Sequence, residues 1–104
     1  MDENLKQFAS NRWAVVGFTH ERAIEIIEEI AASCGKEINR KMLTNNEIVI
    51  EFSDDTTLQH IRASESSIGY RIGKMWCDKN VNKDILYSVI RQMYFGKWDD
   101  IIWL

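Results

Sequence analysis

Residues 13–35 read WAVVGFTHERAIEIIEEIAASCG, and this stretch is the strongest indication of the fold class. The run WAVVGF at 13–18 is continuously apolar and rich in β-forming residues, which is typical of a short strand covered on both faces. Thr19 can cap the helix that follows, and Gly35 can supply the left-handed residue that ends it. A buried strand that leads directly into a helix predicts an α/β fold.

The residues between Thr19 and Gly35 repeat with the period of an amphipathic helix. One side of this helix carries four acids. They form a candidate surface for a protein partner, because ordered negative charge can compete for sites that normally bind nucleic acid. We expect the other side to pack on the sheet. The acids are Glu21, Glu25, Glu28 and Glu29, and the apolar stripe comprises Ala23, Ile24, Ile27, Ile30, Ala31 and Cys34.

Further along the chain, the pattern predicts a β-hairpin and a fourth strand. Residues 47–52 alternate apolar and polar side chains, SDDT supplies a turn, and 56–62 return as the second strand. The fourth strand lies in IGKMWCD at 72–78. Residues 1–11 are expected to form a short helix or an arm, and 36–46 a polar loop with at most a short strand.

The C-terminal part predicts a second helix and a terminal segment. The tail KWDDIIWL at 97–104 is apolar enough to form a terminal strand or a strap across the core. The element order therefore predicts one α/β domain over 1–104, a mixed sheet of about four to five strands with a β-hairpin and two main helices. The second helix is expected to begin at Asp84 and stop at Gly96, with Ile85, Leu86, Val89, Ile90 and Met93 on its buried face.

Length and composition are those of one globular domain. The chain has 104 residues, of which 45% are apolar and 28% charged. No apolar run is long enough to span a membrane and the N-terminal MDENLKQF is polar, so we expect a soluble cytoplasmic protein with no membrane partner. The net charge of −3 argues mildly against non-specific nucleic-acid binding.

The residue types that carry chemistry show no catalytic spacing. None of the Gly-Lys pairs fits the GxxxxGK[ST] loop that cradles phosphates. Cys34 and Cys77 lie outside any CxxC pattern and are expected to be buried, reduced thiols. His20 and His60 have no partner visible in the sequence, and the acids at 51–55 are typical of a turn. We therefore expect no enzymatic activity, no metal and no cofactor.

Two further surfaces are candidates for binding. The aromatic tail either closes the core or exposes Trp98 and Trp103 as an anchor for a protein partner, because tryptophan is favoured in binding hot spots. The second surface would bind nucleic acid through basic groups with nearby aromatic rings, Tyr70 and a half-exposed Trp76, on which bases stack. Its basic residues are Arg71, Lys74, Lys79 and Lys83.

Residues 13–80 resemble part of the ATPase core of phage terminase large subunits. The resemblance runs from the first strand and helix through the hairpin IEFSDDTTLQHI. It continues through Ser66-Ser67 and Gly69-Tyr70-Arg71 to the strand that ends at Asp78. In that family this strand ends in Asp-Glu, so the resemblance implies that Asp78 marks the Walker B position.

Two departures from the family bear on activity. Lys79 stands where the family has the glutamate that polarises the attacking water, and the Walker A strand and loop are missing. Phosphoryl transfer depends on that loop and on a bound metal. The resemblance therefore implies an inherited scaffold without ATP hydrolysis, in which Asp78 caps or hydrogen-bonds the following turn.

The leading hypothesis is a small phage- or prophage-type protein that binds another protein in the cytoplasm of a bacterial host, without catalysis. It would inhibit or modulate a host or defence system, or act as an accessory factor. The alternatives are a nucleic-acid-binding protein that uses residues 71–83, and a degenerate nucleotide-binding or nuclease-like enzyme. A homodimer is a further option, because the hairpin can present an open edge.

Overall fold

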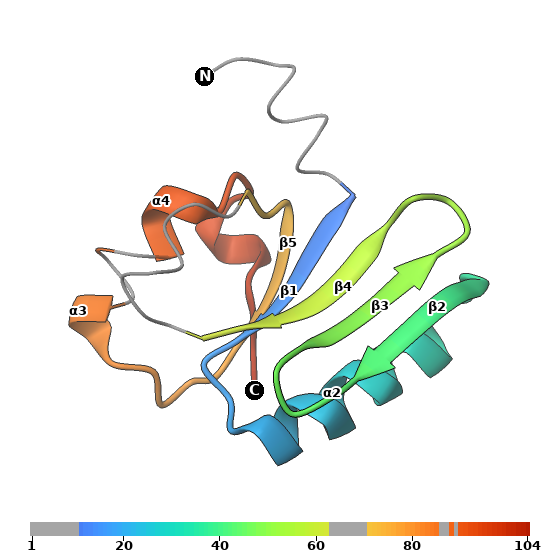
Figure 1. Cartoon of the computed structure of the whole chain (residues 1–104). Helices are drawn as coiled ribbons and strands as arrows, with labels where there is room; N and C mark the ends of the chain where they lie inside the picture. Colours follow the sequence, from blue (N-terminus) through green and yellow to red (C-terminus); the bar gives the residue numbers. More distant parts are fainter. Residues whose placement is uncertain (1–10, 63–70, 86–87, 89) are drawn as a thin grey trace.

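One mixed sheet of six strands organises the chain, which the computed structural model describes over residues 11–62, 71–85, 88 and 90–104 (Figure 1). The strand order is β2-β3-β4-β1-β5-β6, so β2 and β6 form the two edges. In chain order the elements are β1 (Arg12–Val16), α2 (His20–Ser33), β2 (Ile38–Leu43), β3 (Ile48–Phe52), β4 (Thr57–Ile61), β5 (Lys74–Cys77), α3 (Lys83–Ile85), α4 (Arg91–Met93), a 3₁₀ turn (Trp98–Asp100) and β6 (Ile102–Trp103).

Strand directions divide the sheet into two halves. β2, β3 and β4 form an antiparallel meander. β1 runs parallel to both β4 and β5, and β6 runs parallel to β5, so these four strands end at the same side of the sheet. The predicted α/β class, mixed sheet and hairpin are confirmed, with more strands than expected. Within the described residues, no helix is long and apolar enough to cross a membrane.

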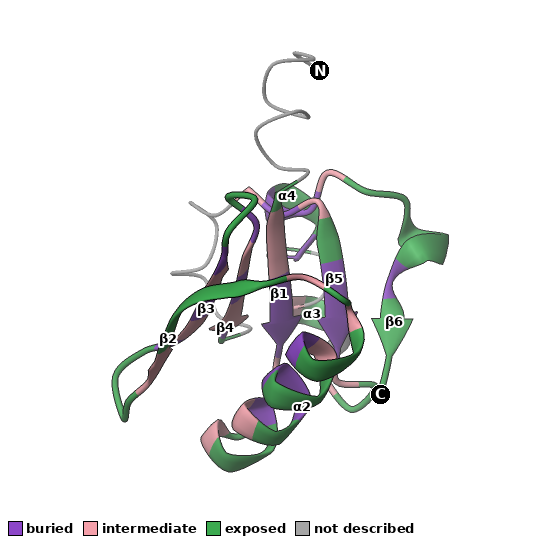
Figure 2. Cartoon of the chain, turned by 90° about the vertical axis from the view of Figure 1, so that its right-hand side faces the viewer, coloured by how far each residue is buried: buried purple, intermediate pink, exposed green. Residues whose placement is uncertain are grey.

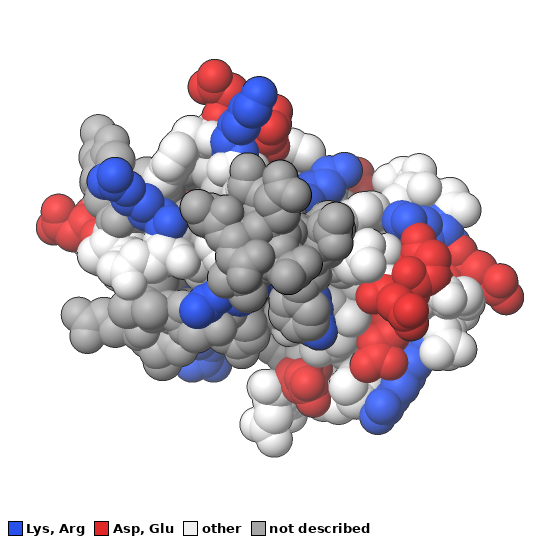
Figure 3. Space-filling view, turned by 90° about the horizontal axis from the view of Figure 1, so that it is seen from above, with Lys and Arg blue, Asp and Glu red and all other residues white. Residues whose placement is uncertain are grey.

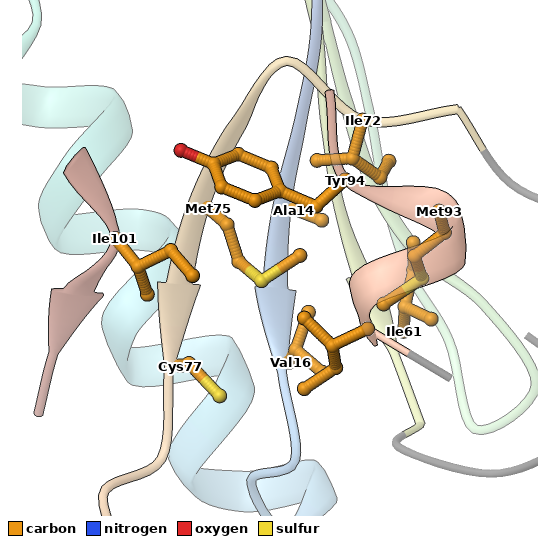
Figure 4. Packing of buried hydrophobic residues seen from close by; sticks show 10 residues of the cluster. Ala14, Val16, Ile61, Ile72, Met75, Cys77, Met93, Tyr94 and Ile101 are labelled. Carbon is orange, nitrogen blue, oxygen red and sulfur yellow. The ribbon is translucent and has the colours of Figure 1, made fainter. Parts of the chain in front are cut away.

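Two apolar clusters cover the two faces of the sheet, and β1 lies between them. Val15 packs in the cluster beneath α2, whereas Ala14 and Val16 pack in the cluster beneath α4 (Figure 4). All three side chains are fully buried. The prediction that this strand is covered on both faces is therefore confirmed.

Helix α2 forms where the sequence predicts it. The hydroxyl of Thr19 accepts a hydrogen bond from the backbone N–H of Arg22 at 3.3 Å, which is the expected N-cap. The buried stripe is rotated from the predicted one. It includes Ile26, which the sequence analysis left out, and only half-buries Ile24, Ile30 and Cys34. The fully buried positions are Ala23, Ile26, Ile27 and Ala31.

The second predicted helix is described only in part. Lys83–Ile85 (α3) and Arg91–Met93 (α4) are helical, and residues 86, 87 and 89, including the predicted core residues Leu86 and Val89, lie outside the described residues. Ile90 and Met93 are buried as predicted, whereas Ile85 is only half-buried. The helix ends before Gly96, because Tyr94 leaves it to pair with Ile72 in a parallel bridge. Tertiary pairing overrides the helical pattern here.

The hairpin turn confirms the local role predicted for its aspartates. The Asp54 carboxylate accepts a hydrogen bond from the Thr56 N–H at 3.0 Å, and it also pairs with Lys36. The Lys36 contact and the bonds to Thr56 lower the pKa of Asp54 to about 2. Asp55 adopts the left-handed conformation that the turn requires, with φ of 70°.

The additional strands lie at the margins of the sheet. Residues 36–46, predicted as a polar loop that can include a short strand, contain the six-residue strand β2 at Ile38–Leu43. A strand at an edge can be polar because one margin meets solvent, which explains why its pattern resembles a loop. The predictions for residues 1–10, for Ser66-Ser67 and for Gly69-Tyr70 concern positions outside the described residues.

Candidate functional site

The margin of the sheet at β6 is apolar and exposed. Of the five large apolar side chains exposed in the described part of the chain, four lie in residues 98–104, which we call the β6 edge. Figure 2 shows β6 exposed at one margin of the sheet. Ile101, in contrast, is 5% exposed and belongs to the core, so the tail both closes the core and exposes apolar groups. The four exposed side chains are Trp98 at 38%, Ile102 at 40%, Trp103 at 42% and Leu104 at 41%.

The backbone of β6 pairs with β5 on one side. The N–H of Leu104 donates to the carbonyl of Cys77, and the carbonyl of Leu104 accepts from the N–H of Lys79, both at 3.0 Å. Main-chain groups of successive strand residues point to opposite sides, so those of Trp103 point away from β5. The outer side of β6 thus presents the N–H and C=O of Trp103 beside exposed apolar side chains.

The opposite margin, β2, is polar. Asn39, Arg40 and Lys41 are exposed, and the pairing of β2 with β3 shifts register between Ile38 and Arg40. Charged side chains and bulges hinder pairing of an edge strand with another chain. Ile38, 41% exposed, is the only large apolar side chain exposed on β2, all of which is described.

The predicted acidic surface on α2 is exposed but partly neutralised. All four glutamates, Glu21, Glu25, Glu28 and Glu29, face solvent. Glu25 pairs with Arg22 at 3.0 Å and Glu28 pairs with Lys41 at 3.3 Å, so two of the four have basic partners. This leaves a mixed surface in place of an acidic stripe.

The predicted basic surface is not one patch. Lys74 begins β5, with its Nζ 4.7 Å from the Trp13 ring and 5.1 Å from the Trp76 ring. Lys79 follows the other end of β5. At the rise of an extended strand, about 3.3 Å per residue, Lys79 lies roughly 16 Å from Lys74. Arg71 instead lies 5.9 Å from the ring of Phe95.

Two further features weaken the nucleic-acid interpretation. Trp76 is only 8% exposed, so the half-exposed stacking ring predicted there is wrong. The end of the molecule seen in Figure 3 shows lysine and arginine lying among aspartate and glutamate on the described surface. Lys83 belongs to α3, and its side chain, like Tyr70, lies outside what the structure describes.

A cavity of about 1000 Å³, which we call the strand-end cavity, opens where the parallel strands end, at the lower end of the sheet in Figure 1. Its walls come from the β1–α2 connection, the β2–β3 turn, the end of β4 and the residues after β5. The chain leaves β1 toward α2 on one face and β5 toward α4 on the other. Ligands of open α/β sheets bind at such points, where neighbouring strands lead to opposite faces.

Glycine is required where β1 enters this cavity. Gly17 has φ of +88°, and a Cβ at this position would lie 3.4 Å from Val81 and 3.5 Å from the Cβ of Asp78. The ends of β1 and β5 therefore approach each other closely. Asp78 accepts a hydrogen bond from the N–H of Asn80 at 2.9 Å, which confirms its predicted role in the following turn.

The cavity brings together the two histidines that had no partner in the sequence. His60 lies on β4, and its Nε2 is 3.0 Å from the carbonyl oxygen of Phe18. That oxygen can only accept, so Nε2 carries the hydrogen. Burial lowers the pKa of His60; the Phe18 bond opposes this, and the charges of His20 and Arg62 lower it further.

The parallel pairing of β1 with β4 explains this meeting. Val15 pairs with His60 and Val16 with Ile61, so the residues after β1 lie beside the end of β4. The sequence pattern does not show which strands pair, so His20 and His60 could not be brought together from the sequence alone. The parallel pairing of β1 with β4 is the information that would have placed both histidines at the strand-end cavity.

The two cysteines differ in burial. Cys77 is fully buried, as predicted, and burial raises its pKa to about 12. Cys34 is half-buried, so the prediction of a buried thiol is met only in part. Within the described residues, no group of three or more histidine, cysteine, aspartate or glutamate side chains is arranged to hold a metal ion.

Comparisons with known proteins identify no relative. A scan against family models, a search of curated proteins and a search of solved structures each found no match. The terminase-like resemblance of residues 13–80 stays a prediction.

Proposed function

We propose that this protein functions by binding another protein, without catalysis, through the β6 edge. The observation that carries the proposal is the exposure of Ile102, Trp103 and Leu104 at an open sheet margin, each at 40–42%. Contiguous exposed apolar groups on a soluble protein mark interaction sites, and tryptophan is enriched among the residues that dominate binding energy.

The geometry of β6 favours addition of a partner strand. Ile102 is in register with Trp76 and Trp103 with Cys77, so their side chains lie on opposite faces of the sheet. An added strand can bond the outward N–H and C=O of Trp103 while its own side chains pack on both faces. Asp99 and Asp100, both exposed beside β6, favour basic groups in the partner.

The partner class follows from the resemblance to phage terminase cores. We propose a bacterial host protein that is inhibited or modulated by this contact. The phage-type origin and the cytoplasmic location are parts of the same proposal.

Capture from a bacterial lysate with quantified variants tests the proposal. The tag is attached at the N-terminus so that β6 remains open. Trp103→Lys introduces a charge at the centre of the edge, and we expect it to reduce the recovery of the captured protein roughly 30-fold, the effect of losing a strong hot spot.

A matched control is available on the opposite margin. Ile38 and Ile102 are the same residue type at 41% and 40% exposure. Ile102→Lys should reduce capture, whereas Ile38→Lys should leave it unchanged. Equal capture by all variants, or no captured protein, contradicts the proposal. Association of the purified protein with itself, abolished by Trp103→Lys alone, would identify the partner as a second copy.

A further inference from the structure

None of the residues of the β6 edge lines the strand-end cavity, so the cavity is a second candidate site. Its volume of about 1000 Å³ lies at the upper end of the range for small-molecule sites. Such sites combine a hollow with a few polar groups that converge from different elements. The walls of this cavity come from four separate parts of the chain.

One wall of the cavity gathers groups that carry or can take up positive charge. His20 comes from the first turn of α2, His60 from β4 and Arg62 from the residue after β4. The charges of His20 and Arg62 both reach His60, since both lower its pKa. These groups from two distant parts of the sequence therefore act on one region of space.

The remaining walls carry acids and amides. Asp78 follows β5, and Glu47 comes from the β2–β3 turn. These carboxylates would repel a ligand that is negative over its whole surface. They would accept hydrogen bonds from hydroxyl or amine groups of a ligand with one anionic end. The basic groups lie toward α2 and β4 and Asp78 lies toward β5, whereas Glu47 lies near the end of β4, because Val49 of β3 pairs with Gln59 of β4.

We propose that the strand-end cavity binds a small organic anion. Its carboxylate or phosphate group lies against His20, His60 and Arg62, and its hydrogen-bond donors face Asp78. The volume exceeds what a bare inorganic anion fills, so the ligand has an organic body.

Binding of this anion couples to a proton on His60. The Nε2–H already donates to the Phe18 carbonyl, so Nδ1 is the nitrogen left for a ligand. In the neutral ring Nδ1 can only accept, whereas in the imidazolium it donates. The charges that lower the pKa of this ring are those of His20 and Arg62; Asp78 follows β5, and Glu47 precedes β3, which pairs with β4. An oxyanion should therefore bind more tightly as the pH falls from 8 to 6.

A titration with sulfate, followed by backbone amide chemical shifts at constant ionic strength, tests the inference on the full chain. Sulfate remains a dianion between pH 6 and 8, so any pH dependence comes from the protein. Malonate and glycerol phosphate, titrated in parallel, distinguish a carboxylate ligand from a phosphate ligand. We expect saturable shifts at Gly17 and His60, and tighter binding by the organic anions that can reach Asp78.

Charge variants give effects of opposite sign. Arg62→Gln should weaken sulfate binding about tenfold, the loss expected for one charge-assisted contact. Asp78→Asn removes a negative charge but keeps an oxygen that accepts from the Asn80 N–H. This variant should bind sulfate severalfold more tightly. His60→Gln should reduce the pH dependence of sulfate binding, because His20 remains as a second group in the wall that can take up a proton. Lys79→Gln is the matched control, because it removes the same charge as Arg62→Gln beside the cavity but not from its walls. His20→Gln serves if Arg62→Gln does not fold.

Two results would overturn the inference. One is the absence of saturable shifts for all three anions at about 10 mM, where a millimolar site is mostly filled. The other is equal weakening by Lys79→Gln and Arg62→Gln, which indicates only general screening of charge. Neither result bears on capture through the β6 edge, because the two tests use different variants and different ligands.

Discussion

The two edges of the sheet differ in length, chemistry and protection. β2 has six residues, is charged along its middle and shifts register against its neighbour. β6 has two residues, and the side chains of Ile102 and Trp103 and of the following Leu104 are about two-fifths exposed. Charge and irregular pairing hinder association at β2, and neither feature is present within β6. This difference indicates which margin is suited to a partner.

Two tryptophans on neighbouring strands give the largest expected difference. Trp76 is 8% exposed and contacts Trp13 at 5.9 Å between ring centroids, whereas Trp103 is 42% exposed. Trp76→Ala should lower the free energy of unfolding by about 3–5 kcal/mol. Trp103→Ala should lower it by less than about 1 kcal/mol. Urea denaturation measures both. Similar losses would mean that β6 closes the core and is not a free edge.

Gly96 controls the segment that leads to β6. A Cβ at this position would lie 2.2 Å from the hydroxyl oxygen of Tyr94, whose hydroxyl donates to the carbonyl of Lys97 at 2.9 Å. Gly96→Ala should therefore cost about 1–3 kcal/mol of stability through overpacking. The perturbation should appear in the amide shifts of β6 and leave those of β2 unchanged. Shifts spread equally over both edges would show that the two margins are not independent.

One substitution can remove a charge that hinders β2 from pairing with another chain. Lys41→Ile takes a charge from the middle of this edge and breaks the exposed pair with Glu28, which is worth at most about 1 kcal/mol. Stability should change little, whereas concentration-dependent self-association should appear in sedimentation. Lys41→Gln keeps the edge polar and should remain like the wild type. If Lys41→Ile behaves like Lys41→Gln, charge is not what protects β2.

Lowering the pH should reduce the free energy of unfolding through His60, which lies on the interior strand β4 and not on an edge strand. The pKa of His60 in the folded protein lies below its ordinary value of 6.5, chiefly because the ring is buried. Below about pH 6.5 the unfolded chain therefore binds more protons than the folded one, and the free energy of unfolding falls until the folded pKa is passed. Above pH 6.5 this contribution is constant. Thermal unfolding between pH 7.5 and 5 should show this slope, and His60→Gln should reduce it.

The interior of the fold follows from local patterns in the sequence. The apolar run of β1, the Thr19 cap and the alternation of the hairpin each depend on neighbours along the chain, and each appears as predicted. The edges were harder to predict. β2 is polar because its outer margin meets solvent, and the helix before Gly96 ends early because Tyr94 pairs with Ile72.

The candidate sites depend on pairing between distant segments. Trp98 and Trp103 were singled out from their residue type, but their exposure depends on which side of β5 the tail joins. The strand-end cavity was not predicted. It forms because β4 pairs with β1, although α2, β2 and β3 lie between these two strands in the sequence. Lys74 and Lys79 are close in the sequence but lie beyond opposite ends of the interior of β5, because an extended strand separates them.

Amide hydrogen exchange at β6 distinguishes an open sheet edge from a covered one. The N–H of Leu104 is bonded to Cys77, whereas the N–H of Trp103 points away from β5. In the free protein we expect protection of the Leu104 amide and rapid exchange of the Trp103 amide. Addition of the captured partner should then protect Trp103. A Trp103 amide that is already protected in the free monomer, or that the partner leaves unprotected, would contradict the account.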